Sequence, residues 1–319
     1  MRQLTLASQA MFEKHSRKSK REVFLDQMEQ VVPWSALLAL VEPFYPKPGP
    51  GRQPAGMSIM LHTYFLQQWF GFSDPGMEEA FYESPVLRRF AGVDLGVAAA
   101  PDESTILRFR HLLEEHELCG QILDTVNLYL ASKGIRIGTG TIVDATILHA
   151  PSSTKNSTGK RDPQMHQTRK GQQWYFGAKA HIGVDSKETV VHSVITSAAS
   201  VADKHMLPDL LHGNEKKVWG DAGYQGQTEA IHEAAPGAQD MTSRRTKFKN
   251  YVDEEAKRKN TTKARVRSKV EHPFRILKRI FGFTKVRYRG LKKNHAWLCT
   301  AFALVNLYQH RNRLAPQGA

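Results

Sequence analysis

The sequence predicts an α/β protein in which an all-helical amino-terminal region precedes a mixed β-sheet with helices packed on it. Up to residue 135, apolar residues recur at helical spacing between breaks rich in Pro and Gly. From Gly134 onward, runs rich in β-branched residues alternate with helical patterns, in the order strand, strand, strand, helix, strand, helix. Because 319 residues are enough for two domains, we assign residues 1–135 to a first domain and residues 136–319 to a second.

The helices of the first domain have recognisable ends. Apolar residues over 22–45 predict a helix that Pro33 divides, and the stretch 45–56 contains too much Pro and Gly to continue it. Another helix is expected from Met57 onward. The candidate N-cap of the next helix is Ser73 or Asp74, and that of the helix after it is Asp102 or Ser104.

The second domain is expected to begin with a strand over 134–148, followed by a hairpin that turns at 185–187. The polar segment 151–172 between them predicts a loop. A fourth strand, within 216–226, ends in a Gly-rich turn. Helices are expected at 201–211, where Pro208 interrupts or shortens the helix, and at 227–235, 264–281 and 291–312.

The composition is typical of a soluble cytosolic protein. The first residues lack the apolar stretch of a secretory signal. The longest apolar run, 296–308, is shorter than the roughly 20 residues that a membrane span needs. Cys119 and Cys299 are too few for a disulfide framework and lack the spacing of a zinc motif.

Positive charge is concentrated in one segment. Residues 244–293 contain 19 Lys and Arg but 4 Asp and Glu, a net charge of +15, whereas the whole chain carries +14. The segment also contains aromatic residues, including Tyr251 and Phe274. A solvated helix face explains a short run of charge, but a run of this length favours a polyanionic partner. Nucleic acid fits better than a membrane surface, because no amphipathic stripe accompanies the charge.

Asp144 lies in the middle of the first predicted strand, where a charge is costly and aspartate is a poor strand former. Asp221 follows the fourth strand, and the carboxyl ends of strands in such sheets face ligand-binding crevices. Two carboxylates about 4 Å apart repel each other by about 4 kcal/mol at an effective dielectric of roughly 20, and a divalent cation removes this cost. Oxygen ligands alone suit Mg²⁺, or Mn²⁺ in its place. A turn or capping role is the alternative for either aspartate.

Glu271 is the candidate for a third carboxylate. Arg267, Glu271 and Lys278 fall on one face of the helix expected in the basic segment. A surface ladder of ion pairs would have the same spacing. Pro273 either kinks this helix or stands in the first turn of a helix that begins near it.

The stretches that carry these acids, in this order, resemble the DDE transposases of bacterial insertion sequences, in the group named insertion sequence five and its relatives. They read TIVDATIL, VWGDAGYQG and ARVRSKVEHPFRILKRIFGF, and the Arg-x3-Glu-x6-Lys pattern appears as Arg267, Glu271 and Lys278. In the first domain, VVPWSALLALVEPFYPK and PDESTILRFRHLLE resemble the helical amino-terminal domain of these proteins. Many relatives have a tyrosine at the position of Ala264. The DNA contact of that tyrosine is therefore not assigned to any residue of this chain.

The resemblance implies a ribonuclease-H-like catalytic domain in which Asp144, Asp221 and Glu271 hold two divalent ions. It implies metal-dependent cleavage at the ends of the element, followed by strand transfer into target DNA. The first domain would recognise the terminal inverted repeats, at least a dimer would pair two ends, and the protein would be associated with the nucleoid. The residues expected to contact DNA are Arg267, Arg275, Lys278 and Tyr224.

Several other residues have two interpretations. Tyr224 either contacts DNA or is buried, and Trp174 is expected to pack in the core rather than to stack on a displaced base. His181 and His272 lie near the expected site but are assigned structural roles. In the first domain, the bases expected to be exposed and available to DNA are Arg88, Arg89, Arg108 and Arg110.

Three other functions remain compatible with parts of the sequence. A ribonuclease-H-like nuclease would share the acids but would only cut DNA, so a strand-joining assay separates it. A DNA-binding regulator derived from a transposase would bind DNA ends without metal-dependent cleavage. A basic structural protein would leave Asp144 unexplained. If Glu271 were not the third ligand, Glu254 or Glu255 would be the next candidate.

Overall fold

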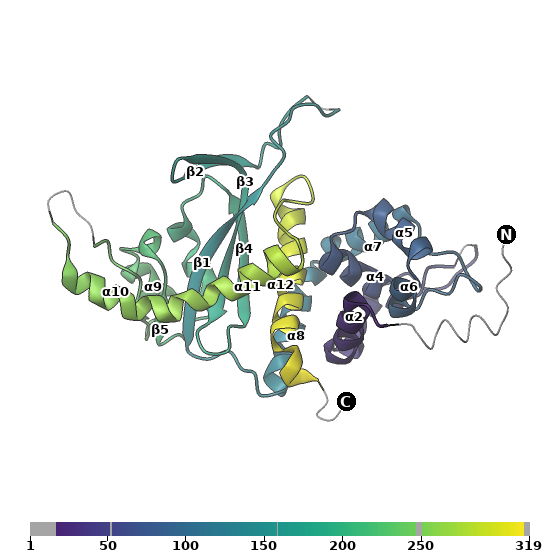
Figure 1. The fold of residues 1–319 in the computed structure, drawn as a ribbon, viewed down its shortest axis with the longest axis horizontal. Coiled ribbons are helices and arrows are strands. Elements are labelled where there is room, and N and C mark those ends of the chain that lie inside the picture. The colour runs from purple at the N-terminus through teal and green to yellow at the C-terminus, as the bar shows by residue number, and fades with distance from the viewer. Residues whose placement is uncertain (1–16, 52, 158, 247–250, 316–319) are drawn as a thin grey trace.

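The computed structural model describes residues 17–51, 53–157, 159–246 and 251–315. The first 16 residues, in which no secretory signal is expected, lie outside the described part. Helices come first along the chain and a mixed sheet follows, as the sequence predicts (Figure 1). Among the described residues, no helix has the length and apolar character needed to span a membrane.

The described part of the first domain is helical. Pro33 separates α2 from α3, as predicted. Ser73 and Asp102 are the caps of α5 and α7: Ser73 Oγ accepts the N–H of Gly76 at 3.1 Å, and Asp102 Oδ1 accepts that of Thr105 at 2.7 Å. The helices are α2 (Lys20–Val31), α3 (Trp34–Val41), η1 (Glu42–Phe44), α4 (Met57–Phe70), α5 (Asp74–Glu83), α6 (Pro85–Ala91), α7 (Glu103–Glu115) and α8 (Leu118–Ser132).

A mixed sheet follows α8. Its strands are β1 (Gly140–His149), β2 (His166–Lys170), β3 (Gln173–Asp185), β4 (Val191–Ala198), β5 (Lys217–Trp219) and β6 (Gln239–Asp240). The main order is β4-β3-β1-β5-β6, in which β3 is antiparallel to β1 and β4, whereas β5 is parallel to β1 and β6. β2 pairs with the first residues of β3. This arrangement agrees with the predicted ribonuclease-H-like fold.

Two local predictions in the second domain are wrong. The segment 151–172 was expected to be a loop, but β2 lies in it, because 166–170 pair with 173–177 around a tight turn at Gly171, where φ is +63°. The segment 201–211 was expected to be an α-helix. It forms the 3₁₀ turns η2 (Asp203–Met206) and η3 (Pro208–Leu210) instead, since Pro208 has no N–H to donate to a continuing helix.

The basic segment forms a succession of helical turns rather than one helix over 264–281. They are α10 (Glu254–Arg267), the 3₁₀ turn η5 (Ser268–Val270), α11 (Glu271–Arg275) and the π-helical turn η6 (Ile276–Ile280). Pro273 is the third residue of α11, directly after the 3₁₀ turn η5, and it has no N–H to donate there. The sequence predicts either a kink at Pro273 or a helix that begins near it. The second arrangement is observed, because α11 begins at Glu271.

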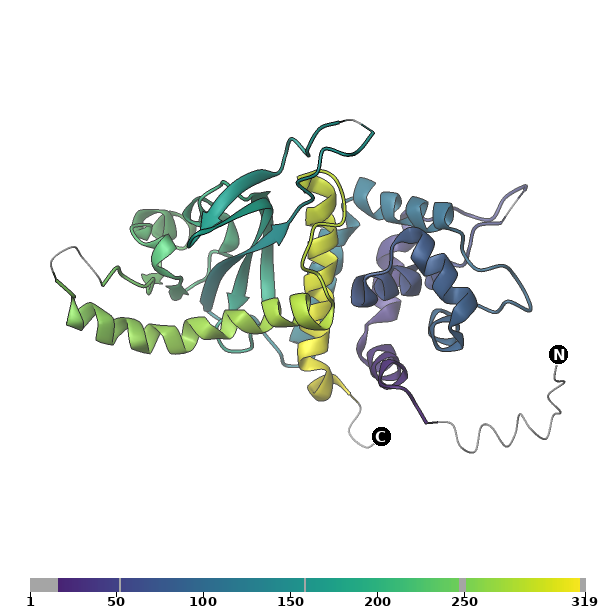
Figure 2. The same ribbon diagram turned by 45° about the horizontal axis from the view of Figure 1, so that its top comes forward.

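The last helix, α12 (Leu291–Leu314), connects the amino-terminal helices to the sheet. It packs on α8, β4 and α2, and both views show it between the sheet and the amino-terminal helices (Figures 1 and 2). Buried Asn306 of α12 donates to Asn127 of α8 at 2.9 Å and to the Val191 carbonyl of β4 at 2.8 Å. One apolar core therefore runs from the amino-terminal helices to this face of the sheet.

A smaller core covers the opposite face of the sheet. It contains Val143 of β1 and Val218 of β5, together with Tyr224 of η4 (Ala222–Tyr224) and Ile231 of α9 (Thr228–Ala234). The two cores together therefore cover both faces of the sheet.

Candidate active site

Asp144 and Asp221 lie at equivalent positions along two neighbouring parallel chain segments, β1 and the continuation of β5. Ile142 of β1 is in register with Trp219 of β5, and each aspartate lies two residues beyond this pair. β5 stops at Trp219 whereas β1 continues to His149, so the edge of β1 next to Asp144 is no longer covered by β5. Asp144 therefore lies in the middle of β1 but beyond the point where β1 pairs with β5. At this position its half-buried carboxylate can reach solvent.

The turn after β5 holds Asp221 in place. Its Oδ1 accepts the N–H of Gly223 at 2.8 Å, which caps η4. At Gly220, an added Cβ would lie 3.0 Å from the ring of Tyr224, so this turn closes tightly over the tyrosine. The capping role considered for Asp221 is therefore present in the structure, and the residue also faces the cavity described next.

The three candidate acids line one cavity of about 590 Å³, although they come from β1, from the turn after β5 and from α11. Asp144 and Asp221 are half-buried, and Glu271 is exposed. The residues that line the cavity are Asp144, Ala145, Thr146, Lys170, Asp221, Arg267, Glu271, His272, Phe274, Arg275, Lys278 and Arg279.

Asp221 and Glu271 are close enough to Asp144 to affect its ionisation. Burial raises the pKa of Asp144 most, and the negative charges of Asp221 and Glu271 add to this shift. The Ala145 N–H and Arg267 oppose it, and the net result is a pKa raised from 3.8 to about 6. A cation in the cavity would favour the ionised form of Asp144.

The donor set suits a hard divalent ion that keeps other ligands. Across the described residues, no three His, Cys, Asp or Glu side chains lie close enough together to enclose one ion. Mg²⁺ is ordinarily held by one or two carboxylates and completes its shell with waters and substrate phosphates, so an open set of carboxylates fits it. Asp144, Asp221 and Glu271 provide only oxygen donors, which do not select zinc.

Basic side chains surround the acids. Lys278 Nζ donates to Thr146 Oγ1 at 2.5 Å and to the Ile147 carbonyl at 3.0 Å, and burial and the charge of Lys170 lower the pKa of this lysine. Three of the four residues predicted to contact DNA, Arg267, Arg275 and Lys278, line the cavity.

Two bases of the cavity were missed from the sequence. Lys170 belongs to β2, in a segment expected to be a loop, and no local pattern marks its approach to the site. Arg279 directly follows Lys278, which is predicted to contact DNA. This proximity in the sequence could have identified Arg279 as a further base of the cavity.

Tyr224 is the fourth residue predicted to contact DNA, and the structure contradicts this. Its side chain is fully buried in the smaller core, and among the described residues its hydroxyl has no hydrogen-bond partner. Of the two interpretations of Tyr224, the buried one is the one observed.

Trp174 departs from the prediction in the opposite direction. It was expected in the core but is 64% exposed, on β3 opposite Arg169 of β2. His181 is buried, its Nε2 lies 2.8 Å from Ser197 Oγ, and burial lowers its pKa to about 4, so it is a neutral core residue at pH 7. His272 is exposed at the rim of the cavity.

The four arginines of the first domain are not equally available. Arg110 was expected to be exposed, but it is buried, bonds Asp74 and Glu114, and stacks over the ring of Tyr288 at 4.1 Å. Two of the others are also engaged: Arg88 donates to backbone carbonyls, and Arg89, although exposed, pairs with Glu22. Arg108 is exposed.

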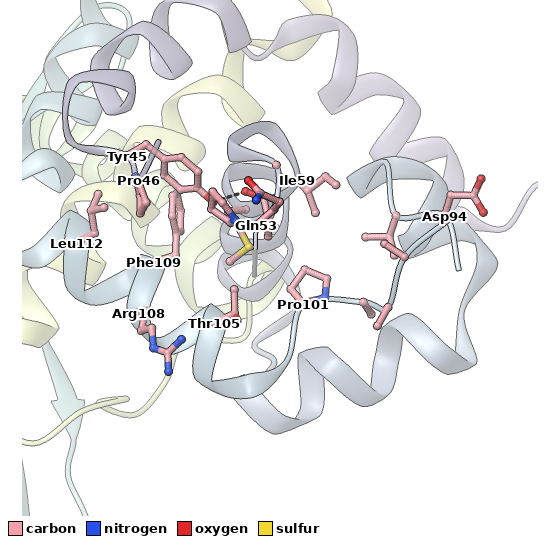
Figure 3. A pocket seen from close by; sticks show the side chains of 18 residues that line it. Tyr45, Pro46, Gln53, Ile59, Asp94, Pro101, Thr105, Arg108, Phe109 and Leu112 are labelled. Atoms are coloured by element: carbon pink, nitrogen blue, oxygen red, sulfur yellow. Dashed lines mark hydrogen bonds between the residues drawn. The ribbon is translucent and has the colours of Figure 1, made fainter. Parts of the chain in front are cut away.

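A second cavity, of about 600 Å³, lies among α7, the first turn of α4 and the segments that precede these two helices (Figure 3). Its lining is mainly apolar, with Tyr45, Phe109 and Leu112 on one side and Asp94 towards the other. It lacks the grouped acids and bases of the first cavity, so it offers no chemistry on a phosphodiester.

Comparison with known protein families gives two matches. The family described as "Transposase DDE domain" matches residues 136–307, more than half of the chain. The family described as "Transposase domain (DUF772)" matches residues 12–112. No solved structure matches the chain significantly.

Proposed function

The chain belongs to the DDE transposases of insertion sequences, and we propose that Asp144, Asp221 and Glu271 are its catalytic carboxylates. Members of this family act on DNA, cutting it and transferring strands with the help of divalent metal ions. The observation that carries the proposal is the cavity itself. Three acids from distant parts of the chain face one space that is otherwise lined mainly by bases.

We propose Mg²⁺ as the natural ion, with Mn²⁺ as a substitute. Asp144, Asp221 and Glu271 would hold it together with water and phosphate oxygens. A bound ion supplies an activated water or hydroxyl as the nucleophile and stabilises the departing oxygen. The protein holds its carboxylates apart around an open space, so a phosphate group of DNA fits between them and the surrounding bases.

The bases of the cavity have a separate task. Arg267, Arg275 and Lys278 would bind phosphates on either side of the scissile bond, which fixes the DNA relative to the acids. Lys278 is itself fixed by Thr146 and the Ile147 carbonyl, so its charge is positioned before DNA arrives. Preorganised charge of this kind requires little rearrangement during the reaction.

The remaining assignments concern the rest of the chain. Residues 1–135 would recognise the terminal inverted repeats and residues 136–319 would perform the chemistry, in at least a dimer that is associated with the nucleoid. The Arg-x3-Glu-x6-Lys pattern and the sequence VEHPF support placement in the group named insertion sequence five.

The experiment that tests this function uses a supercoiled plasmid carrying the DNA on both sides of this gene. Purified protein is added with Mg²⁺ or Mn²⁺, and the products are mapped. We expect cuts at the boundary of inverted repeats and joined products. Asp144→Ala, Asp221→Ala and Glu271→Ala should each abolish both without abolishing end binding. Asp209→Ala, which removes an exposed carboxylate outside the cavity, is the matched control.

The competing functions predict other products. Cleavage without any joined strand would identify a nuclease that only cuts. End binding without cleavage, unchanged by Asp144→Ala, would identify a regulator. Full activity of Glu271→Ala would remove Glu271 from the site. The next candidates from the sequence, Glu254 and Glu255, do not line the cavity and pair with Lys257 and Lys259.

A further inference from the structure

Exposed arginines follow the helical segment that leads away from the cavity. Arg258 and Arg265 lie on α10, one heptad apart and so on one face of it, and Arg275 and Arg279 lie further along the same succession of helical turns, on α11 and η6. All four are exposed, and Arg275 and Arg279 also line the cavity. We call these four residues the basic stripe. One end of the stripe is therefore in the candidate active site, and the other is on an exposed helix.

The charge of the basic stripe is not neutralised by the protein. Glu254 and Glu255, at the start of α10, pair with Lys257 and Lys259. From Ala256 to the end of the chain, Glu271 is the only acidic residue, and it faces the cavity. Within the described residues, none of the four guanidinium groups of the stripe has an ion-pair or hydrogen-bond partner.

The dimensions of the stripe suit a duplex. From Arg258 to Arg279 a helical rise of 1.5 Å per residue gives a length of roughly 30 Å, close to one turn of B-DNA. Arginine binds phosphate oxygens through its planar fork, and such contacts carry no sequence preference. The occupant that fits is therefore duplex DNA held through its backbone.

The position of α10 indicates which part of the DNA this is. Helix α10 extends away from α11, which lines the cavity, on the side opposite the amino-terminal helices, and both views agree on the course of these helices (Figures 1 and 2). If the first domain holds the element end, as the proposed function has it, DNA on the other side of the scissile phosphate passes along α10. We propose that the basic stripe binds the donor DNA that flanks the element, outside the cut.

Two duplexes that share one mapped element end test this proposal. The first stops at the cleavage position, and the second continues for 20 base pairs of flanking DNA. Binding is measured by fluorescence anisotropy in EDTA over a series of NaCl concentrations. The variant is Arg258→Gln with Arg265→Gln, which leaves every cavity residue in place.

The variant should lose affinity for the flanked duplex alone. Two lost phosphate contacts lower the log–log salt slope by about 1.8, because each contributes about 0.9. Binding to the pre-cut duplex should equal that of the wild type. The matched control is Arg136→Gln with Lys217→Gln, two exposed bases near the opposite, amino ends of β1 and β5, and it should change neither slope.

Other outcomes overturn the proposal. Equal losses on both duplexes would place the element end on the stripe. No loss on either duplex, with strand transfer also unchanged, would show that the stripe is only a solvated surface. Unchanged binding with a loss of strand transfer would assign the stripe to target DNA. The proposed function is tested separately, by whether the wild type prefers the end duplex to an unrelated duplex of equal length.

Discussion

The Nζ atom of Lys278 lies 2.5 Å from Oγ1 of Thr146, and this contact fixes the basic helical segment to β1 beside the candidate active site. Thr146 is two residues from Asp144 and so projects from the same face of the strand. One ammonium group thereby joins two elements that are 132 residues apart in the sequence and carries a positive charge into the cavity.

Replacing Lys278 should separate these two roles. In Lys278→Met the charge and the hydrogen bonds are lost, so we expect about 100-fold slower cleavage and a free energy of unfolding lower by about 1–2 kcal/mol. Thr146→Val removes only the hydroxyl acceptor, so it should cost part of the stability and little of the rate. Cleavage rates and urea unfolding measure both, and a wild-type rate for Lys278→Met would exclude a role for its charge.

Asp144 should destabilise the metal-free protein at neutral pH. Its pKa is raised to about 6 in the fold from the ordinary 3.8, so the folded state holds a proton that the unfolded chain has released between these values. Stability therefore falls as the pH rises from about 4 to 6, and the full cost remains above 6. Asp144→Asn should raise the free energy of unfolding at pH 7.5 in EDTA by up to about 3 kcal/mol.

The same substitution should have no effect on stability near pH 3, where the carboxyl group is protonated in both states. Mg²⁺ should stabilise the wild type at pH 7.5 and stabilise it less below pH 6, where protons compete for Asp144. Urea unfolding in EDTA and in Mg²⁺ at both pH values checks this, with Asp209→Asn as the exposed control. A destabilised Asp144→Asn at pH 7.5 would contradict the electrostatic argument.

Tyr224 should tolerate loss of its hydroxyl but not of its ring. The buried hydroxyl has no partner among the described residues, so Tyr224→Phe should leave the free energy of unfolding unchanged or raise it by about 1 kcal/mol. Tyr224→Ala should lower it by about 3–5 kcal/mol, because it empties the smaller core. The salt dependence of DNA binding by Tyr224→Phe should match that of the wild type. A reduced salt slope would indicate that the tyrosine leaves the core when DNA binds.

Arg110 and Arg108 should respond differently to the same change. Arg110→Ala leaves Asp74 and Glu114 without their cation and uncovers Tyr288, so we expect a loss of about 3 kcal/mol in the free energy of unfolding. Arg108→Ala alters an exposed side chain and should change stability by less than about 0.5 kcal/mol. Chemical unfolding of both variants measures this, and equal losses would contradict the buried network.

Local patterns predicted most of the secondary structure because they report on neighbours in the chain. Ser73 and Asp102 cap helices as expected, since a cap needs only the backbone two or three residues ahead. β2 was missed for the same reason. Its residues are polar and mostly exposed, and only the pairing with β3 makes them a strand.

The sequence by itself determined that helices precede a sheet, the family of the chain and the acids worth considering, because strand patterns, caps and motif spacing are local properties. Only the tertiary structure decided that three acids from separate segments face one cavity, and that Arg110 is buried against Tyr288. The tertiary structure also decided that Tyr224 is buried in the core and that Trp174 is exposed to solvent. Burial depends on partners far away in the chain, and no spacing along the sequence records which of them will cover a given side chain.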